Sequence, residues 1–125
     1  MNENQIAREV VDACYKIHTT LGPGLLESAY EIVLAHELRK RGLTVDCQTY
    51  LPVIYDGIEL EAGFRTDLIV DDKLIVELKS IEKVAPVHRK QLLTYLRLSN
   101  RKLGLLVNFG SHLIKDGIFR VVNDL

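Results

Sequence analysis

The sequence predicts a single α/β (α+β) domain in which a mixed central sheet is flanked by helices. Hydrophobic residues first recur at helical spacing, and after Gly42 the pattern changes to the alternation of β-strands. A further helical pattern separates these strands from two later ones, an order that is typical of helices packed on a sheet. The chain has 125 residues, the length of one domain, and shows no internal repeat or linker.

Three helices are expected, and each has signals at its ends. The first covers residues 4–20 and is followed by a Gly-Pro-Gly sequence that breaks the helix. The second covers residues 25–41, where three basic residues in the last turn complement the helix dipole and a glycine supplies the stop. The third covers residues 86–99 and begins with a proline, whose fixed φ suits a first helical turn.

The remaining hydrophobic segments are predicted to be strands. Pro52 suggests a strand start or an edge strand, and Asp56-Gly57 predicts a hairpin turn. Two almost continuously hydrophobic segments indicate central strands that are covered on both faces. The strands are therefore expected at residues 45–51, 53–55, 58–60, 65–70, 74–80, 103–108 and 118–122.

Composition limits the classes of function. The 47% hydrophobic and 26% charged residues are ordinary for a globular protein, and the net charge of −1 argues against a histone-like protein that coats nucleic acid. Cys14 and Cys47 are expected to be core or half-buried thiols, because two cysteines cannot form a four-thiolate metal site. The sequence shows no signal-peptide pattern and no membrane-spanning segment, so a cytoplasmic location with no membrane contact is expected.

Three ionisable residues lie on the two expected central strands. Asp67, Glu77 and Lys79 have hydrophobic neighbours, where an isolated charge is costly, so they are expected to be paired or to bind a metal. Glu77 and Lys79 are two residues apart and therefore share one face of a strand. Asp67 pairs with Glu77 only if the intervening turn has three residues, 71–73, or contains a bulge. A two-residue turn would pair Asp67 with Val76 and place it on the opposite face.

Two chemical interpretations of this group are open. In the first, the two carboxylates hold Mg²⁺, which prefers oxygen ligands and keeps several waters. The metal would polarise a phosphate and activate water, while Lys79 positions the nucleophile or stabilises developing charge. In the second, an ion pair between Lys79 and Asp67 or Glu77 only supports the sheet. These three residues alone do not choose between the two.

The same residues resemble the signature of a known superfamily. Asp67 followed by Glu77-Leu78-Lys79 resembles the motif of the PD-(D/E)XK nucleases. Thr66 stands where the name of the superfamily has a proline, which is often missing in its members. The resemblance implies a restriction-endonuclease-like three-layer core and hydrolysis of phosphodiester bonds with Mg²⁺, for which Mn²⁺ can substitute.

Two further motifs narrow the resemblance. Gly24-Leu25-Leu26-Glu27 resembles the GxxE motif of RecB-like nucleases, and the segment from Gln91 to Tyr95 resembles their QxxxY motif. With Tyr30, the first motif also matches the pattern that names the GxxExxY family of small bacterial proteins. The motifs occur in the expected order, whereas the four cysteines that hold an iron–sulfur cluster in some RecB-like relatives are missing.

The resemblance implies roles for individual residues. Asp67 and Glu77 would bind the metal together with the carbonyl of Leu78, and Lys79 would be the catalytic lysine. Glu27 would reach the same site directly or through a metal-bound water. The remaining matches, which would contact the substrate phosphate or orient the lysine, are Gln91 and Tyr95.

Other candidates have competing interpretations. Lys83, His88 and Arg89 could bind a phosphate backbone, or could form a solvated helix start. For Glu27, the competing interpretation is that its carboxylate lies in the first turn of a helix only because the helix dipole stabilises it there. Tyr30 is expected to pack in the core with its hydroxyl bonded.

The sequence thus predicts a metal-dependent nuclease whose partner is nucleic acid, DNA before RNA. One alternative is a non-catalytic nucleic-acid- or partner-binding domain with a nuclease-like fold, although such a domain would be expected to have lost one of the three ionisable residues. Another is an interaction subunit that needs a second protein. Few basic residues are available to grip a duplex, which makes a homodimer or a partner protein plausible.

Overall fold

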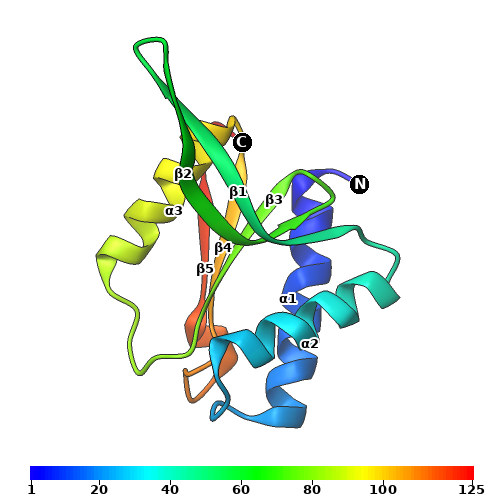
Figure 1. Cartoon of the computed structure of the whole chain (residues 1–125). Helices are drawn as coiled ribbons and strands as arrows, with labels where there is room; N and C mark the ends of the chain where they lie inside the picture. Colours follow the sequence, from blue (N-terminus) through cyan, green and yellow to red (C-terminus); the bar gives the residue numbers. More distant parts are fainter.

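A five-stranded sheet lies between helices on both of its faces (Figure 1). The computed structural model describes residues 1–125, except for the side chains of residues 61 and 62. In chain order, the elements are α1 (Glu3–Leu21), α2 (Glu27–Lys40), β1 (Val45–Tyr55), β2 (Ile58–Val70), β3 (Leu74–Lys79), α3 (Pro86–Ser99), β4 (Leu103–Asn108), the 3₁₀ helix η1 (Ile114–Gly117) and β5 (Ile118–Val122).

The sheet is mixed, and its strands are ordered β1-β2-β3-β4-β5. β3 and β4 are parallel, whereas the other neighbouring pairs are antiparallel. A parallel pair needs a long crossover connection, and α3 supplies it between β3 and β4. The predicted mixed sheet with flanking helices is therefore confirmed.

One layer of the core lies between the sheet and helices α1 and α2. The hydrophobic stripe of α1 is fully buried there, with Cys14 among its members. Burial raises the pKa of the Cys14 thiol to about 12, which leaves it unreactive. Tyr30 stacks on Phe109 with ring centroids 4.3 Å apart, and its hydroxyl donates to the Gly22 carbonyl. The predicted buried Tyr30 with a bonded hydroxyl is confirmed.

The second layer lies between α3 and the opposite face of the sheet. Leu92 and Leu96 of α3 pack there against Ile75 and Leu106. A Cβ atom on Gly104 would lie 2.9 Å from Leu92, so glycine at this position lets the helix approach β4 closely. These two hydrophobic layers fix the central strands between the helices.

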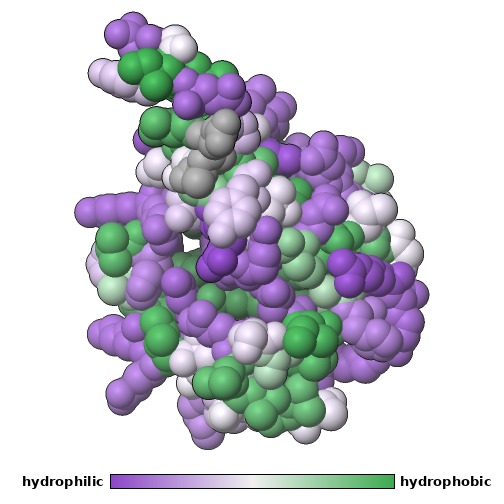
Figure 2. Space-filling view, viewed as in Figure 1, coloured by the Kyte–Doolittle hydropathy of each residue, from purple (hydrophilic) through white to green (hydrophobic). Residues whose placement is uncertain are grey.

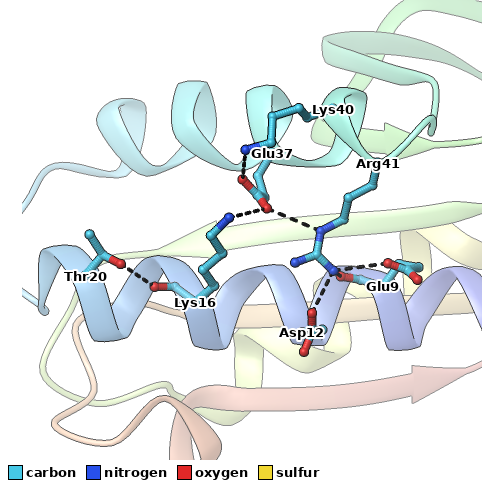
Figure 3. A network of polar contacts seen from close by, with 7 residues as sticks. All are labelled: Glu9, Asp12, Lys16, Thr20, Glu37, Lys40 and Arg41. Carbon is cyan, nitrogen blue, oxygen red and sulfur yellow. Dashed lines mark hydrogen bonds and ion pairs between the residues drawn. The ribbon is translucent and has the colours of Figure 1, made fainter.

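A network of charged side chains joins α1 to α2 at the surface (Figure 3). Glu37 is only 8% exposed, and its carboxylate accepts hydrogen bonds from Lys16 at 2.9 Å and from Arg41 at 3.4 Å. Arg41 also donates to Asp12 at 2.8 Å and to Glu9 at 3.1 Å. Lys40 also forms an ion pair with Glu37 at 3.6 Å, and because all three partners are cations, the carboxylate is compensated despite its burial.

The division of the long hairpin into four short strands was wrong. β1 continues through Pro52, and β2 is also one unbroken strand. The pairing register of the two strands shifts between Leu51 and Val53. Since β1 is an edge strand, the missing N–H of proline is tolerated at a bulge without ending the strand. The predicted turn is present, with positive φ at both Asp56 and Gly57. The end of this hairpin projects away from the three layers (Figure 1).

The helix boundaries differ little from those expected. α2 begins at Glu27 instead of residue 25, because Leu26 has an extended backbone and forms the N-cap. Within the described residues, no helix has both the length and the hydrophobicity needed to cross a bilayer.

Candidate active site

Asp67 and Glu77 meet where β2 and β3 separate. The turn between the strands has three residues, and Leu68 pairs with Val76, which is the register that the site hypothesis required. Continuing this register places Asp67 opposite Glu77. Pairing of the two backbones stops there, and the N–H of Leu78 donates instead to Oδ2 of Asp67 at 2.8 Å. The Asp67 side chain thus occupies the fork between the strands.

The Glu77 carboxyl is held in an environment that disfavours its charge. Its Oε1 is buried and has no hydrogen-bond partner among the described residues. Burial, followed by the neighbouring Asp67 carboxylate, raises the pKa of Glu77 from 4.5 to about 9, although Lys79 acts in the opposite direction. An unpaired acid beside a second carboxylate is therefore a position that a cation would stabilise.

The donor atoms at the fork fit Mg²⁺. Within the described residues no group of three or more His, Cys, Asp or Glu side chains could hold a metal. Mg²⁺ does not require such a group of three, since its usual ligands are one or two carboxylates and several waters. The carbonyl of Leu78 points to the same strand edge as its N–H, toward Asp67, because both groups of one residue in a strand face the same neighbour. Asp67, Glu77 and this carbonyl could together hold the ion.

Lys79 follows Glu77 on the same face of β3. Its charge lies near enough to lower the pKa of Glu77, and no ion pair fixes its ammonium in the described part of the chain. Its carbonyl accepts from the N–H of Phe109 at 2.9 Å, which anchors the end of β3 to the segment after β4. The lysine is therefore held through its backbone while its side chain stays available.

The GxxE segment lies against the end of β3. Glu27, the first residue of α2, accepts a hydrogen bond from the N–H of Ser80 at 3.3 Å. Ser80 in turn donates through its hydroxyl to the carbonyl of Leu25 at 2.6 Å. These two contacts bring Glu27 beside the residue that follows Lys79.

A cavity of about 370 Å³ opens beside the fork, with walls from α2, β1, β2 and β3. Asp67 is one of its lining residues, but Glu77 and Lys79 are not. Asp67 therefore connects the cavity to the contact with Glu77. A larger cavity of about 610 Å³ lies between α1 and strands β4 and β5, and contains neither acid. The smaller cavity is lined by Glu27, Ser28, Glu31, Gln48, Arg65, Asp67 and Leu78.

Four of these lining residues were not identified from the sequence: Ser28, Glu31, Gln48 and Arg65. Glu31 lies one turn after Glu27 on α2, and that spacing was the available signal for it. Gln48 lies opposite Asp67 on β1, donates to Oδ1 of Asp67 at 3.3 Å and also donates to Glu31. Its φ of +50° is a left-handed conformation that is costly for a residue with a side chain. Arg65 precedes Asp67 by two residues and so shares its strand face.

The two residues of the QxxxY segment differ in position. Tyr95 is half-buried and stacks on Phe64 with ring centroids 4.4 Å apart. Burial raises the pKa of the Tyr95 phenol, and the charges of Glu77 and Asp67 raise it further. Gln91, one turn earlier, is exposed and has no side-chain hydrogen bond within the described residues. The charges of the two acids thus act on Tyr95, whereas no side-chain hydrogen bond of the described residues joins Gln91 to the site.

The basic residues near the start of α3 lie apart from the fork. His88 accepts from the N–H of Ala85 at 3.0 Å through Nδ1, so its ring caps the helix. The guanidinium of Arg89 lies 4.8 Å from the centre of the Phe119 ring. Lys83 and Arg89 line a separate cavity of about 440 Å³ that contains neither Asp67 nor Glu77.

Comparison with known proteins gives a family match. A family model described as the PD-(D/E)XK nuclease superfamily matches residues 4–121. Neither curated proteins nor solved structures give a significant match. The matched range contains the fork, the GxxE segment and α3, so the model spans every residue of the site described above.

Proposed function

Because the chain belongs to the PD-(D/E)XK nuclease superfamily, we propose that it is a metal-dependent nuclease that hydrolyses phosphodiester bonds of DNA or RNA. The observation that carries this proposal is the fork: Asp67 faces Glu77, a buried oxygen of Glu77 has no hydrogen-bond partner among the described residues, and Lys79 follows on the same strand. A sheet that needed only an internal ion pair would be expected to satisfy that oxygen. The non-catalytic alternative does not explain why all three groups are present.

The residues at the fork have complementary roles in the proposed reaction. Mg²⁺, when bound, neutralises charge on the phosphate and lowers the pKa of a coordinated water. Asp67, Glu77 and the Leu78 carbonyl would hold the ion, with Glu77 in its ionised form. Lys79 donates to the phosphate or to the attacking water and stabilises the charge that develops.

Residues from the two flanking helices complete the site. Glu27 would reach it from α2, directly or through a metal-bound water, and the hydrogen bond from the N–H of Ser80 to its carboxylate supports this placement. Tyr95 approaches the acids from α3, where it orients Lys79 or contacts the phosphate. Gln91 contacts the substrate further along the same helix. Lys83 and Arg89 bind the nucleic-acid backbone outside the site.

The motifs refine the proposal to a particular group. We assign the chain to the RecB-like branch and to the GxxExxY family of small bacterial proteins, with Mg²⁺ as the metal and DNA as the preferred substrate. A cytoplasmic location and a homodimer or a partner protein belong to the same proposal.

Cleavage assays with matched variants test the activity. We expect the purified chain to cut members of a panel of single- and double-stranded DNA and RNA when Mg²⁺ or Mn²⁺ is added. Lys79→Ala should slow cleavage at least about 100-fold, because it removes a group that stabilises the transition state. Lys115→Ala, which removes an exposed lysine of η1, should cleave like the parent chain. Equal cleavage by Lys79→Ala and the parent would refute the mechanism.

Metal binding can be measured separately. Calorimetry with Mn²⁺ should detect binding to the parent chain and a large loss of affinity in Glu77→Ala. Unchanged affinity in that variant would show that the ligand set is wrong.

A further inference from the structure

Tyr50 and Arg65 form an exposed pair next to the fork. They are opposite one another on β1 and β2, and the Arg65 guanidinium carbon lies 5.8 Å from the centre of the Tyr50 ring. The ring is 60% exposed, and Arg65 is exposed as well. An aromatic ring and a guanidinium are therefore held together at the surface with room for a ligand to contact both.

The position of Arg65 connects this pair to the candidate active site. Arg65 lines the same cavity as Asp67, Glu27 and Glu31, and among the described residues that line it, Arg65 is the one cationic side chain. None of these carboxylates forms an ion pair with it in the described part of the chain. Two residues of a strand span roughly 7 Å, so the guanidinium is anchored within one nucleotide's reach of Asp67.

The chemistry of the pair fits one nucleotide. A guanidinium binds phosphate through two parallel hydrogen bonds, and its face can remain stacked on an aromatic ring. An exposed tyrosine ring provides a surface on which a base can stack, an interaction that tolerates any base. A base inside a duplex is already paired and stacked, and so cannot use this surface.

The rest of the hairpin limits where a nucleic acid can run. Residues 51–62 contain three acidic residues and no lysine, arginine or histidine. The end of the hairpin projects from the body (Figure 1), and hydrophilic and hydrophobic side chains lie next to each other on the face of it that Figure 2 shows. Its negative charge repels phosphate, so a strand bound at Arg65 would cross the base of the hairpin instead of following it outward.

We propose that Tyr50 and Arg65 form a subsite for the nucleotide next to the scissile phosphodiester, and that the chain therefore acts on single-stranded or locally unpaired nucleic acid. Arg65 binds the phosphate of that nucleotide, and Tyr50 stacks on its unpaired base. This inference rests on the proposed nuclease function and specifies its substrate class.

Binding without turnover tests the subsite. Fluorescence anisotropy in EDTA, where metal-dependent cleavage cannot occur, measures affinity for a labelled single strand of about 12 nucleotides, close to the upper range of sites that rely on stacking. Tyr50→Ala should weaken binding about tenfold, whereas Tyr50→Phe retains the ring and should bind like the parent chain. Arg65→Gln should weaken binding and reduce the salt dependence by the equivalent of about one phosphate contact.

A substrate change provides a matched control. One abasic nucleotide, moved along the strand, should weaken binding to the parent chain at one position and have no effect there on Tyr50→Ala. Equal binding by Tyr50→Ala and Tyr50→Phe would overturn the proposal, as would a duplex that binds as tightly as the single strand.

Binding and cleavage measured together show whether the proposed subsite or the proposed function is wrong. If the parent chain binds single strands through Tyr50 but cuts nothing with Mg²⁺ or Mn²⁺, the subsite stands and the nuclease function is wrong. If the parent chain cuts nucleic acid and Tyr50→Ala cuts it with unchanged KM and kcat, the nuclease function stands and the subsite is wrong.

Discussion

The buried acid at the fork predicts a specific pH dependence of stability. In the folded chain the pKa of Glu77 is about 9, above the value of 4.5 expected for the unfolded chain. Between these values the folded chain keeps a proton that the unfolded chain releases, so the free energy of unfolding must fall as pH rises. This contribution is fully present below the unfolded pKa and is lost as pH rises through the folded pKa.

The size of the effect follows from the same two values. One proton contributes about 1.4 kcal/mol for each pH unit, so from about pH 5 to about pH 8 Glu77 should lower the free energy of unfolding by up to about 4 kcal/mol. Glu77→Gln has no proton to release and keeps nearly the same shape. We therefore expect this variant to match the parent chain near pH 5 and to be clearly more stable near pH 8.

Urea unfolding followed by circular dichroism measures this difference, with EDTA present so that no metal binds. Glu82→Gln serves as the control because it removes an exposed carboxylate from the loop after β3. It should lose stability with pH in parallel with the parent chain. If Glu77→Gln also loses stability in parallel with the parent, Glu77 does not carry a raised pKa and the account of the fork is wrong.

Three other substitutions test the surroundings of the fork. Gln48→Gly should raise the free energy of unfolding by about 1 kcal/mol, because glycine relieves the strain of the left-handed backbone. The same variant should bind Mn²⁺ more weakly in calorimetry, and unchanged affinity would exclude a role for Gln48 in positioning Asp67. Asn108→Ala should cost about 2–4 kcal/mol in urea unfolding, because it leaves the N–H and carbonyl of Ile81 without their side-chain partners. Tyr30→Phe removes a hydroxyl that bridges two backbone groups before α2, and should cost about 1–3 kcal/mol in thermal unfolding; an unchanged Tm would contradict this.

The sequence predicted the fold class because hydrophobic periodicity is local information. The helix at Pro86–Ser99 and the strand at Leu103–Asn108 have the predicted boundaries, since a proline and a continuous hydrophobic segment mark them. The length of the turn after β2 was left open by the sequence, and the structure has the three residues that the site hypothesis required. The long hairpin could not be divided correctly, because the tolerance of Pro52 depends on β1 being an edge strand, a property of the whole sheet.

The residues of the candidate site also divide into those that the sequence indicated and those that it did not. Asp67, Glu77 and Lys79 stand out in the sequence because charged residues are rare in buried strands. Gln48 and Arg65 gave no such signal, since polar residues on a half-exposed hairpin are ordinary. Their relation to the site exists only because β1 pairs with β2 and brings them to the cavity at Asp67.

The sequence by itself determined which residues can carry chemistry and on which elements they lie, because periodicity and residue type are properties of short segments. Only the tertiary structure decided which of these residues are in contact with one another. Separation of β2 from β3 puts the Leu78 N–H on Asp67, whereas capping by His88 and the stacking of Arg89 on Phe119 keep the basic residues of α3 in another cavity. These contacts depend on strand register and on packing between distant segments, which no short stretch of sequence specifies.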